Sequence, residues 1–186
     1  MKKILSMICF LFLFGTKSEA GMMIDPYIGY AINQQEITQT VGAQTGQIDY
    51  TTSGSLFGAR VGWQTLGLML GGEFAYGPSL TQELTASALS GISTGAETDY
   101  SGTYMGAFIG YDFPILLRAW ATYFFNITYA PESGSDVEAN GTSFGVGFSG
   151  LPFVSLNAEY RMISYDNSAI DDSSEVFLSV SLPITF

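Results

Sequence analysis

The sequence predicts an all-β fold: an eight-stranded antiparallel up-and-down transmembrane β-barrel after an N-terminal signal peptide. Three observations lead to this prediction. The chain of 186 residues is 47% hydrophobic but only 12% charged, which is about half the charged fraction of an average soluble domain. Short segments alternate between apolar residues and polar or small residues with a period of two. The connections between these segments are alternately long and short.

The first twenty residues have the layout of a secretory signal peptide. Lys2 and Lys3 precede an apolar run over residues 4–14, and a small-x-small cleavage site ends at Ala20. The apolar run is too short for a membrane-spanning helix, which needs about 20 apolar residues. We therefore expect a signal peptide over residues 1–20 and a single β-barrel domain over residues 21–186.

Removal of the signal peptide would take away all three lysines, the only cysteine and one glutamate, so that the net charge changes from −11 to −13. The remaining basic residues are Arg60, Arg118 and Arg161, and the chain contains no histidine. Nucleic-acid binding, which needs clustered Lys and Arg, is excluded. Disulfides, thiolate or imidazole metal sites, and Ser-His or Cys-His catalysis are excluded as well. We expect no cofactor and no enzymatic activity.

Eight segments show the two-residue alternation that is typical of membrane barrel strands. They are residues 24–33, 57–63, 66–76, 105–111, 117–129, 143–149, 154–162 and 175–186. The last segment is the clearest, with Val176, Leu178 and Val180 on one face. In residues 117–129 the apolar face is predicted to continue to Ile127 and Tyr129. These apolar faces are expected to contact lipid.

The seven connections alternate in length without exception. They are residues 34–54, 64–67, 78–99, 112–116, 131–140, 150–152 and 166–173. An up-and-down barrel has short periplasmic turns and longer extracellular loops. A closed sheet also pairs every backbone group inside the hydrocarbon layer, because it has no edge. We therefore expect four long loops on one side, and the short turns with both termini on the other.

The charged residues of the strands fall on the face opposite the predicted lipid-facing side chains. They are Asp25, Arg60, Glu73, Arg118, Glu159, Arg161 and Glu175. An arginine on the lipid face at mid-bilayer costs roughly 2–4 kcal/mol, so this placement is energetically favourable. Eight strands enclose an interior that side chains just fill. We expect the seven residues to form a buried ionic network that plugs the barrel, while an ion or solute path is the alternative.

Aromatic residues indicate where the two membrane rims lie. On the side of the short turns these residues are Trp63, Tyr111, Phe113 and Phe186. On the side of the long loops they are Tyr76 and Tyr129.

The four long connections hold eleven acidic residues. They are Glu36, Asp49, Glu83, Glu97, Asp99, Glu132, Asp136, Glu138, Asp166, Asp171 and Asp172. Surface carboxylates can bind Ca²⁺ or Mg²⁺. Their spacing here matches no known cation cage, so we interpret them as groups that provide solubility and charge repulsion, and expect no metal site.

Residues 21–186 resemble the small OmpA/OmpX-type outer-membrane β-barrels, porin-like proteins of Gram-negative bacteria. The stretch Ser-Leu-Asn-Ala-Glu-Tyr-Arg over residues 155–161 looks like the seventh strand of such barrels, and the last strand ends in Phe186. The resemblance implies a location in the outer membrane, in contact with its lipid and lipopolysaccharide. It also implies that Phe186 is a signal for the outer-membrane assembly machinery.

Three functional hypotheses follow. The leading one is a structural or surface-interaction protein whose four acidic extracellular loops contact a cell-surface ligand, because loops on a rigid scaffold often carry function. The second is a narrow channel or small-solute conduit across the outer membrane. The third is a soluble periplasmic β-sandwich, which the apolar faces of residues 117–129 and 175–186 disfavour because those faces would contact water.

Overall fold

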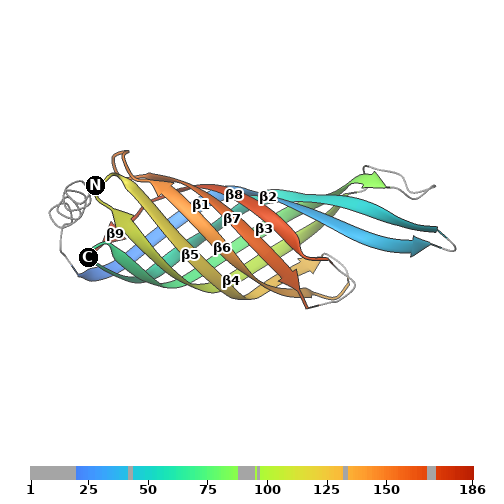
Figure 1. Cartoon of the computed structure of the whole chain (residues 1–186), viewed down its shortest axis with the longest axis horizontal. Helices are drawn as coiled ribbons and strands as arrows, with labels where there is room; N and C mark the ends of the chain where they lie inside the picture. Colours follow the sequence, from blue (N-terminus) through green and yellow to red (C-terminus); the bar gives the residue numbers. More distant parts are fainter. Residues whose placement is uncertain (1–19, 42–43, 88–94, 96, 132–133, 167–170) are drawn as a thin grey trace, which may run out of the picture.

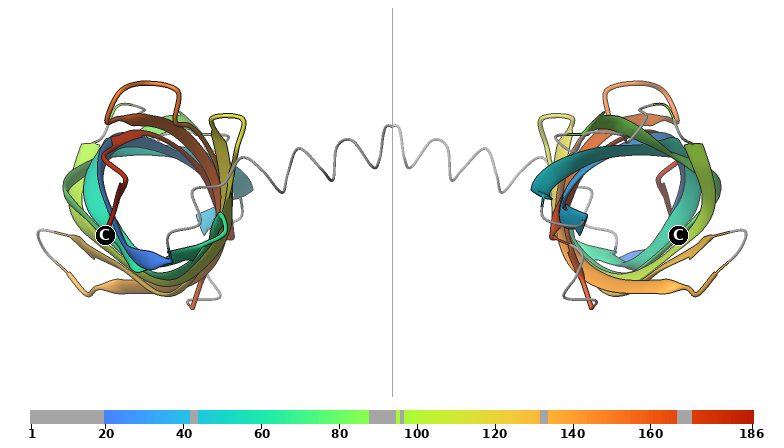
Figure 2. Two further views of the ribbon diagram at one scale, coloured as in Figure 1. Left: turned by 90° about the vertical axis from the view of Figure 1, so that its left-hand side faces the viewer. Right: turned by 90° about the vertical axis from the view of Figure 1, so that its right-hand side faces the viewer.

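Eight long antiparallel strands form a closed barrel in the computed structural model of this protein (Figures 1 and 2). The structure describes residues 20–41, 44–87, 95, 97–131, 134–166 and 171–186. The predicted signal peptide, except Ala20, lies outside the described residues. The long strands are β1 (Gly21–Val41), β2 (Gln44–Thr65), β3 (Leu68–Ser87), β4 (Glu97–Phe113), β5 (Leu117–Pro131), β6 (Val137–Phe148), β7 (Ser155–Tyr165) and β8 (Ser173–Ser181). The predicted eight-stranded up-and-down barrel is confirmed.

Every long strand pairs with its neighbours along the chain, and β8 closes the ring by pairing with β1. A short strand, β9 (Ile184–Thr185), also pairs with β1. The predicted last strand over residues 175–186 is therefore divided between β8 and β9. Pro183 lies in the interruption, where the lack of an N–H group prevents a ladder hydrogen bond. In the part of the chain that the structure describes, no helix is long and apolar enough to cross a membrane.

The outer surface of the barrel carries a belt of exposed apolar side chains. Ile28 is 62% exposed, Ile109 59% and Leu178 58%. Other members are Phe57, Val61, Leu70, Phe74, Tyr123, Phe125, Phe144, Val146, Leu156, Tyr160, Val176 and Val180. A continuous apolar surface of this extent is rare on a soluble monomer. It fits the hydrocarbon layer of a membrane, where a closed sheet has no edge with unpaired backbone groups.

The rim on the side of the short turns has the predicted aromatic residues on its surface. Trp63 and Phe186 are exposed, and the rings of Tyr111 and Phe113 pack edge to face with centroids 5.0 Å apart. The first turn on this side consists of Leu66 and Gly67, which have φ angles of 50° and 83°. Two successive positive φ angles characterise the type I′ turn, whose twist matches that of the flanking strands.

The first two long connections are largely strand, in contrast to the loops that the sequence predicted. β1 and β2 pair in one continuous register from Gly21 with Gln64 to Val41 with Gln44, and this hairpin extends far beyond the body of the barrel (Figure 1). β3 and β4 also continue into the predicted connection 78–99. One physical reason is local packing, because Ile48 and Leu84 form a small apolar cluster with Tyr50.

The predicted lipid-facing pattern of residues 117–129 is wrong in its last part. Ile127 is fully buried and Tyr129 is 8% exposed, and both belong to the core cluster inside the barrel. The cause is a β-bulge, since Gly106 of β4 pairs with Phe124 while the adjacent Met105 pairs with Asn126. The extra residue, Phe125, reverses the inward and outward alternation beyond it. Tyr129 therefore does not belong to the aromatic rim.

Candidate functional site

The seven charged residues predicted for the interior all point into the barrel, and none is more than 4% exposed. Six different strands contribute them: β1, β2, β3, β5, β7 and β8. The two-residue period of each strand determines this placement, because alternate side chains face the lumen. The described residues include no group of three or more His, Cys, Asp or Glu side chains arranged to hold a metal ion.

Arg60 is the centre of the network. Its Nη1 lies 3.1 Å from Oδ2 of Asp25, and its Nε lies 3.5 Å from Oε2 of Glu73. Its Nη2 donates to Oε1 of Glu159. The guanidinium carbon also lies over two rings, 4.7 Å from the centroid of Tyr27 and 4.3 Å from that of Trp120. Buried charge is thus compensated by ion pairs and by cation–π contacts.

Arg118 connects opposite walls of the barrel. Its Nη1 lies 2.8 Å from Oδ2 of Asp25, and β5 and β1 are four strands apart in the ring of eight. Its Nη2 donates to Oδ1 of Asn157 over 2.8 Å and to Oγ of Ser181 over 2.7 Å. The arginine therefore spans the lumen near its turn side.

Arg161 links the network toward the loop side. Its Nη1 lies 2.8 Å from Oε1 of Glu175, and its Nη2 lies 3.4 Å from Oε2 of Glu159. The guanidinium is 4.2 Å from the ring centroid of Phe177. The hydroxyl of Tyr104 donates to Oε2 of Glu175 over 3.2 Å, and this contact joins β4 to β8, which are also opposite strands.

The sequence reasoning missed the neutral side chains that complete the network. The hydroxyl of Tyr27 donates to Oε1 of Glu73 over 2.8 Å, and that of Thr122 donates to Oε2 over 2.7 Å. Tyr27, Thr122 and Trp120 share the inward parity of Asp25 and Arg118 on their strands. That parity could have identified them, whereas their individual partners depend on how the distant strands meet across the lumen.

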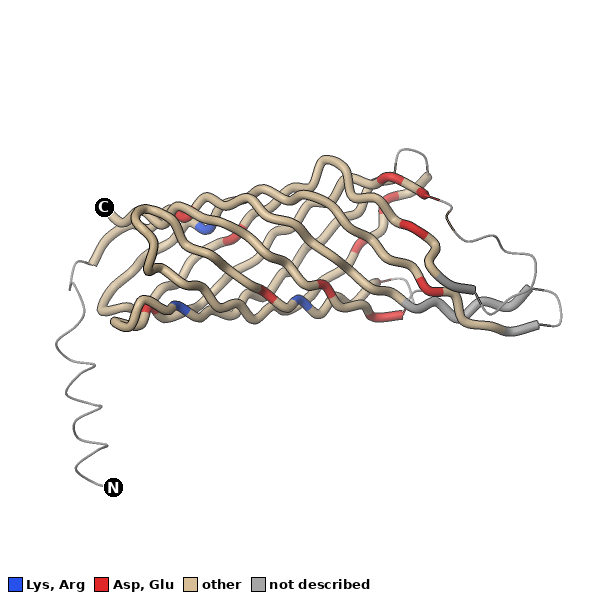
Figure 3. Tube along the Cα trace, turned by 90° about the horizontal axis from the view of Figure 1, so that it is seen from above, with Lys and Arg blue, Asp and Glu red and all other residues tan. Residues whose placement is uncertain are grey.

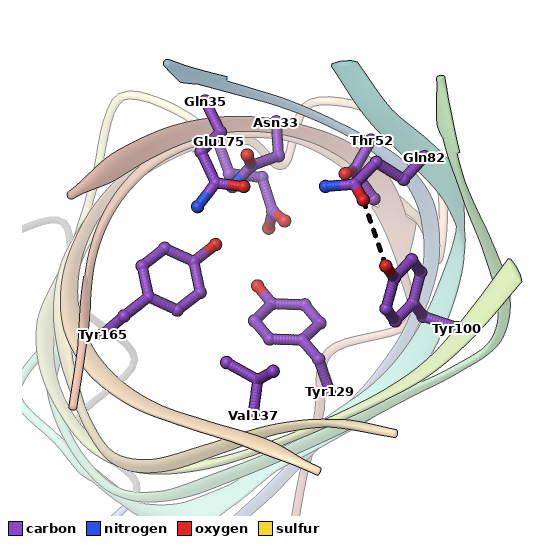
Figure 4. A pocket seen from close by; sticks show the side chains of 9 residues that line it. All are labelled: Asn33, Gln35, Thr52, Gln82, Tyr100, Tyr129, Val137, Tyr165 and Glu175. Atoms are coloured by element: carbon purple, nitrogen blue, oxygen red, sulfur yellow. Dashed lines mark hydrogen bonds between the residues drawn. The ribbon is translucent and has the colours of Figure 1, made fainter. Parts of the chain in front are cut away.

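The interior acids outnumber the interior bases. Four carboxylates, on Asp25, Glu73, Glu159 and Glu175, face three guanidinium groups. At the loop end of this network, Glu175 lines a pocket of about 180 Å³ inside the barrel (Figure 4).

The exposed charge is acidic and gathers at the loop end of the barrel (Figure 3). Eight of the eleven predicted acids are exposed: Glu83, Glu97, Asp99, Asp136, Glu138, Asp166, Asp171 and Asp172. Asp49 is half-buried. Glu132 and the side chain of Glu36 lie outside the described part of the structure.

Phe186, the predicted assembly signal, is 73% exposed at the turn side. Its backbone N–H donates to the carbonyl oxygen of Met22 over 2.9 Å. The end of the chain is thereby attached to β1 with the aromatic ring free. Its role in assembly stays a prediction.

Known proteins resemble this chain in fold only. No protein-family model matches the chain, and no curated protein matches its sequence. The structure of Ail, the attachment invasion locus protein of Yersinia pestis, in complex with the heparin analogue sucrose octasulfate, aligns with a TM-score of 0.53 and 11% identity. That alignment covers 88% of this chain and 99% of Ail.

Two further structures align over most of their length. The outer membrane protein OprG from Pseudomonas aeruginosa gives a TM-score of 0.52 at 10% identity, covering 91% of this chain and 97% of OprG. Neisserial surface protein A (NspA) gives a TM-score of 0.45 at 14% identity, and the alignment covers 90% of this chain and 99% of NspA. The closed ring of strands, the apolar belt and the likeness to Ail and OprG agree with one another. The chain is a small eight-stranded β-barrel of the outer-membrane type, and its place is the bacterial outer membrane.

Proposed function

We propose that this protein is a non-enzymatic, sealed barrel that presents extended hairpins and acidic loops for interactions at the cell surface. The observation that supports a sealed lumen is the pair of contacts between opposite walls. Arg118 reaches Asp25 over 2.8 Å, and Tyr104 reaches Glu175 over 3.2 Å. Between these two levels, Arg60 and Arg161 share Glu159.

The energetics of this network oppose spontaneous opening. A buried charge that loses its partner destabilises a protein by about 3–5 kcal/mol. A path for ions or solutes would have to separate several of these pairs together. The alternative of a narrow conduit therefore needs a large rearrangement of the interior.

Conductance in planar lipid bilayers tests the sealed lumen. The refolded protein is expected to give no stable open level across the range of applied voltages. Arg60→Ala and Glu73→Ala are the matched variants, because both residues belong to the network. A stable open level in the wild type that these variants alter would replace the proposal by the channel alternative.

The charge of the exposed surface limits the kind of partner that can bind. Ail was solved with a heparin analogue, but a polyanion of this kind does not suit our chain. All three arginines are buried, and all three lysines lie within the first 19 residues. We propose a neutral or cationic partner, so the refolded barrel should pass unretained through a heparin column at low salt. Retention that sodium chloride reverses would contradict this proposal.

The role of the hairpin β1–β2 can be tested separately. Gln35 and Tyr50 are paired across the two strands, so an Asn-Gly turn that joins them removes residues 36–49 without changing the register. The shortened protein should retain a heat-dependent shift in gel migration and remain silent in bilayers. Its adhesion to cells or to immobilised surface components should fall. Unchanged adhesion combined with altered permeability would refute the surface role.

A further inference from the structure

The loop end of the lumen contains a pocket that the sealed barrel does not require. Its volume is about 180 Å³, below the roughly 300–1,000 Å³ of pockets for drug-sized ligands. Glu175 lines it together with Tyr100, Tyr129 and Tyr165. In Figure 4 the hydroxyl groups of Tyr129 and Tyr165 point into the pocket, toward Glu175. The pocket therefore suits a small molecule or one group of a larger ligand.

Glu175 has acceptor capacity beyond its partners in the protein. A carboxylate offers about four lone-pair positions. The described residues supply two donors, Nη1 of Arg161 at 2.8 Å and the hydroxyl of Tyr104 at 3.2 Å. Arg161 also pairs with Glu159 over 3.4 Å, so its charge is shared between two acids.

The numbers of acidic and basic groups in the lumen also favour a bound cation. Four buried carboxyl groups lie beside three guanidinium groups, so the interior acids outnumber the interior bases by one. Glu175 is the acid of this network that lines the pocket. Eight further acids are exposed at the same end of the barrel (Figure 3). With an acid and no base among its described lining residues, the pocket suits a cation better than an anion.

The other lining groups distinguish between kinds of cation. Ca²⁺ takes six to eight oxygen ligands, whereas the described residues that line this pocket include one carboxylate. The amides of Asn33, Gln35 and Gln82 can present their oxygens to N–H donors, and Val137 and the tyrosine rings offer apolar contact. Rings of this kind also attract an organic cation.

We propose that the pocket binds a primary ammonium group on a short alkyl chain. The ammonium donates to the Glu175 carboxylate and to tyrosine or amide oxygens, and the alkyl chain lies against the rings and Val137. One bound ammonium offsets the excess of one interior acid over the interior bases. This site is independent of the surface role, because it uses the lumen wall below the loops.

The first experiment is a titration of the refolded barrel in detergent micelles with n-butylammonium chloride, followed by calorimetry or by shifts of amide resonances. Saturable binding is expected. 1-Butanol, which has the same chain without the charge, and sodium chloride, which has the charge without the chain, should neither bind there nor compete. Absence of saturable binding, or equal competition by sodium, would overturn the proposal.

Three variants locate the site. Glu175→Gln should weaken binding by about tenfold or more, as expected for the loss of a hydrogen bond to a charged group. Val137→Phe should block the pocket without changing any charge. Glu138→Gln is the matched control, because Glu138 is an exposed acid next to Val137, and it should bind as the wild type does.

The outcomes distinguish binding in the pocket from general electrostatic attraction to the acidic surface. If Glu138→Gln weakens binding as much as Glu175→Gln does, the acidic surface alone is responsible and the proposal fails. Retained binding in Val137→Phe also contradicts it. Should Glu175→Gln fail to give the heat-shifted band of a folded barrel, Val137→Phe decides the matter, because Val137 lies outside the ionic network.

Discussion

Interior glycines make room for the large side chains that fill this barrel. A Cβ atom built on Gly145 would overlap the ring of Trp120, and one on Gly58 would lie 2.7 Å from the ring of Tyr27. A Cβ atom on Gly106 would lie 2.9 Å from the ring of Phe124, and one on Gly110 would lie 2.7 Å from Cβ of Trp120. The space that these glycines leave lets the aromatic rings approach the guanidinium groups, as Trp120 does with its centroid 4.3 Å from Cζ of Arg60. Small residues on one strand thus determine the position of charges on another.

This complementarity predicts the effect of adding a side chain at Gly145. Gly145→Leu should destabilise the barrel by at least about 1–3 kcal/mol, because Trp120 must leave its position. Gly72→Leu is the control, since Gly72 faces outward and a Cβ there meets nothing nearer than 3.7 Å. Refolding yield in detergent, measured by the heat shift on a gel, should fall for Gly145→Leu only. Equal yields would mean that the interior is loosely packed.

A second prediction concerns Arg161, which pairs with Glu159 and Glu175. Arg161→Met should cost about 3–5 kcal/mol of unfolding free energy, because it leaves the buried Glu175 without a guanidinium partner and Glu159 with Arg60 alone. Adding Glu175→Gln should restore part of the loss. Urea titration in lipid vesicles measures both variants, with the lipid-facing Met162→Leu as the neutral reference. A loss for Arg161→Met no larger than that of the reference would show that the pairs are not structurally important.

At the scale of the strand, the two-residue alternation predicts which side chains face inward better than it predicts where each strand ends. It placed all seven interior charges, because one inward residue determines the parity of a regular strand. It failed at Ile127 and Tyr129, where the bulge at Phe125 reverses the parity. A bulge depends on pairing with both neighbours, which a single strand does not encode. The hairpin extensions were missed for a similar reason, since polar residues such as Thr51 and Thr52 occur in loops and in exposed strands alike.

The bulge gives a prediction of its own. Toward β4, Phe125 is the extra residue, since Gly106 pairs with Phe124 and Met105 with Asn126. Toward β6 the strand also has one residue too many between Phe124, which pairs with Gly141, and Ile127, which pairs with Ala139. Deletion of Phe125 should leave Ile127 and Tyr129 inside the barrel and permit folding.

Deletion of Ala158 is the control for this test. In the regular strand β7, the loss of one residue would turn Glu159 and Arg161 toward lipid. Comparison of the heat-shifted bands decides between the two deletions. The assignment of the bulge would be incorrect if the Phe125 deletion prevented folding as completely as the Ala158 deletion.

For the whole molecule, charge is separated into three zones that the sequence alone could anticipate only in part. The outer belt is apolar, the lumen holds paired charges, and the loop end is acidic (Figure 3). Strand parity and the alternating connections predicted these zones. The contacts across the lumen, such as Tyr104 with Glu175 and Thr122 with Glu73, depend on the diameter and stagger of the closed ring. They require the three-dimensional structure.

The position of the belt in the membrane leads to a depth-dependent prediction. Leu178 lies in the middle of the outward face of β8, and Ser174 lies on the same face near the loop end. Leu178→Arg should lower the unfolding free energy in lipid vesicles by roughly 2–4 kcal/mol, whereas an arginine near the interface should cost about 0–1 kcal/mol, as in Ser174→Arg. If the sheet faced water instead, Leu178→Arg would be harmless and would increase solubility. Because the two variants share strand, face and added charge, the difference between them measures the depth of each position in the hydrocarbon.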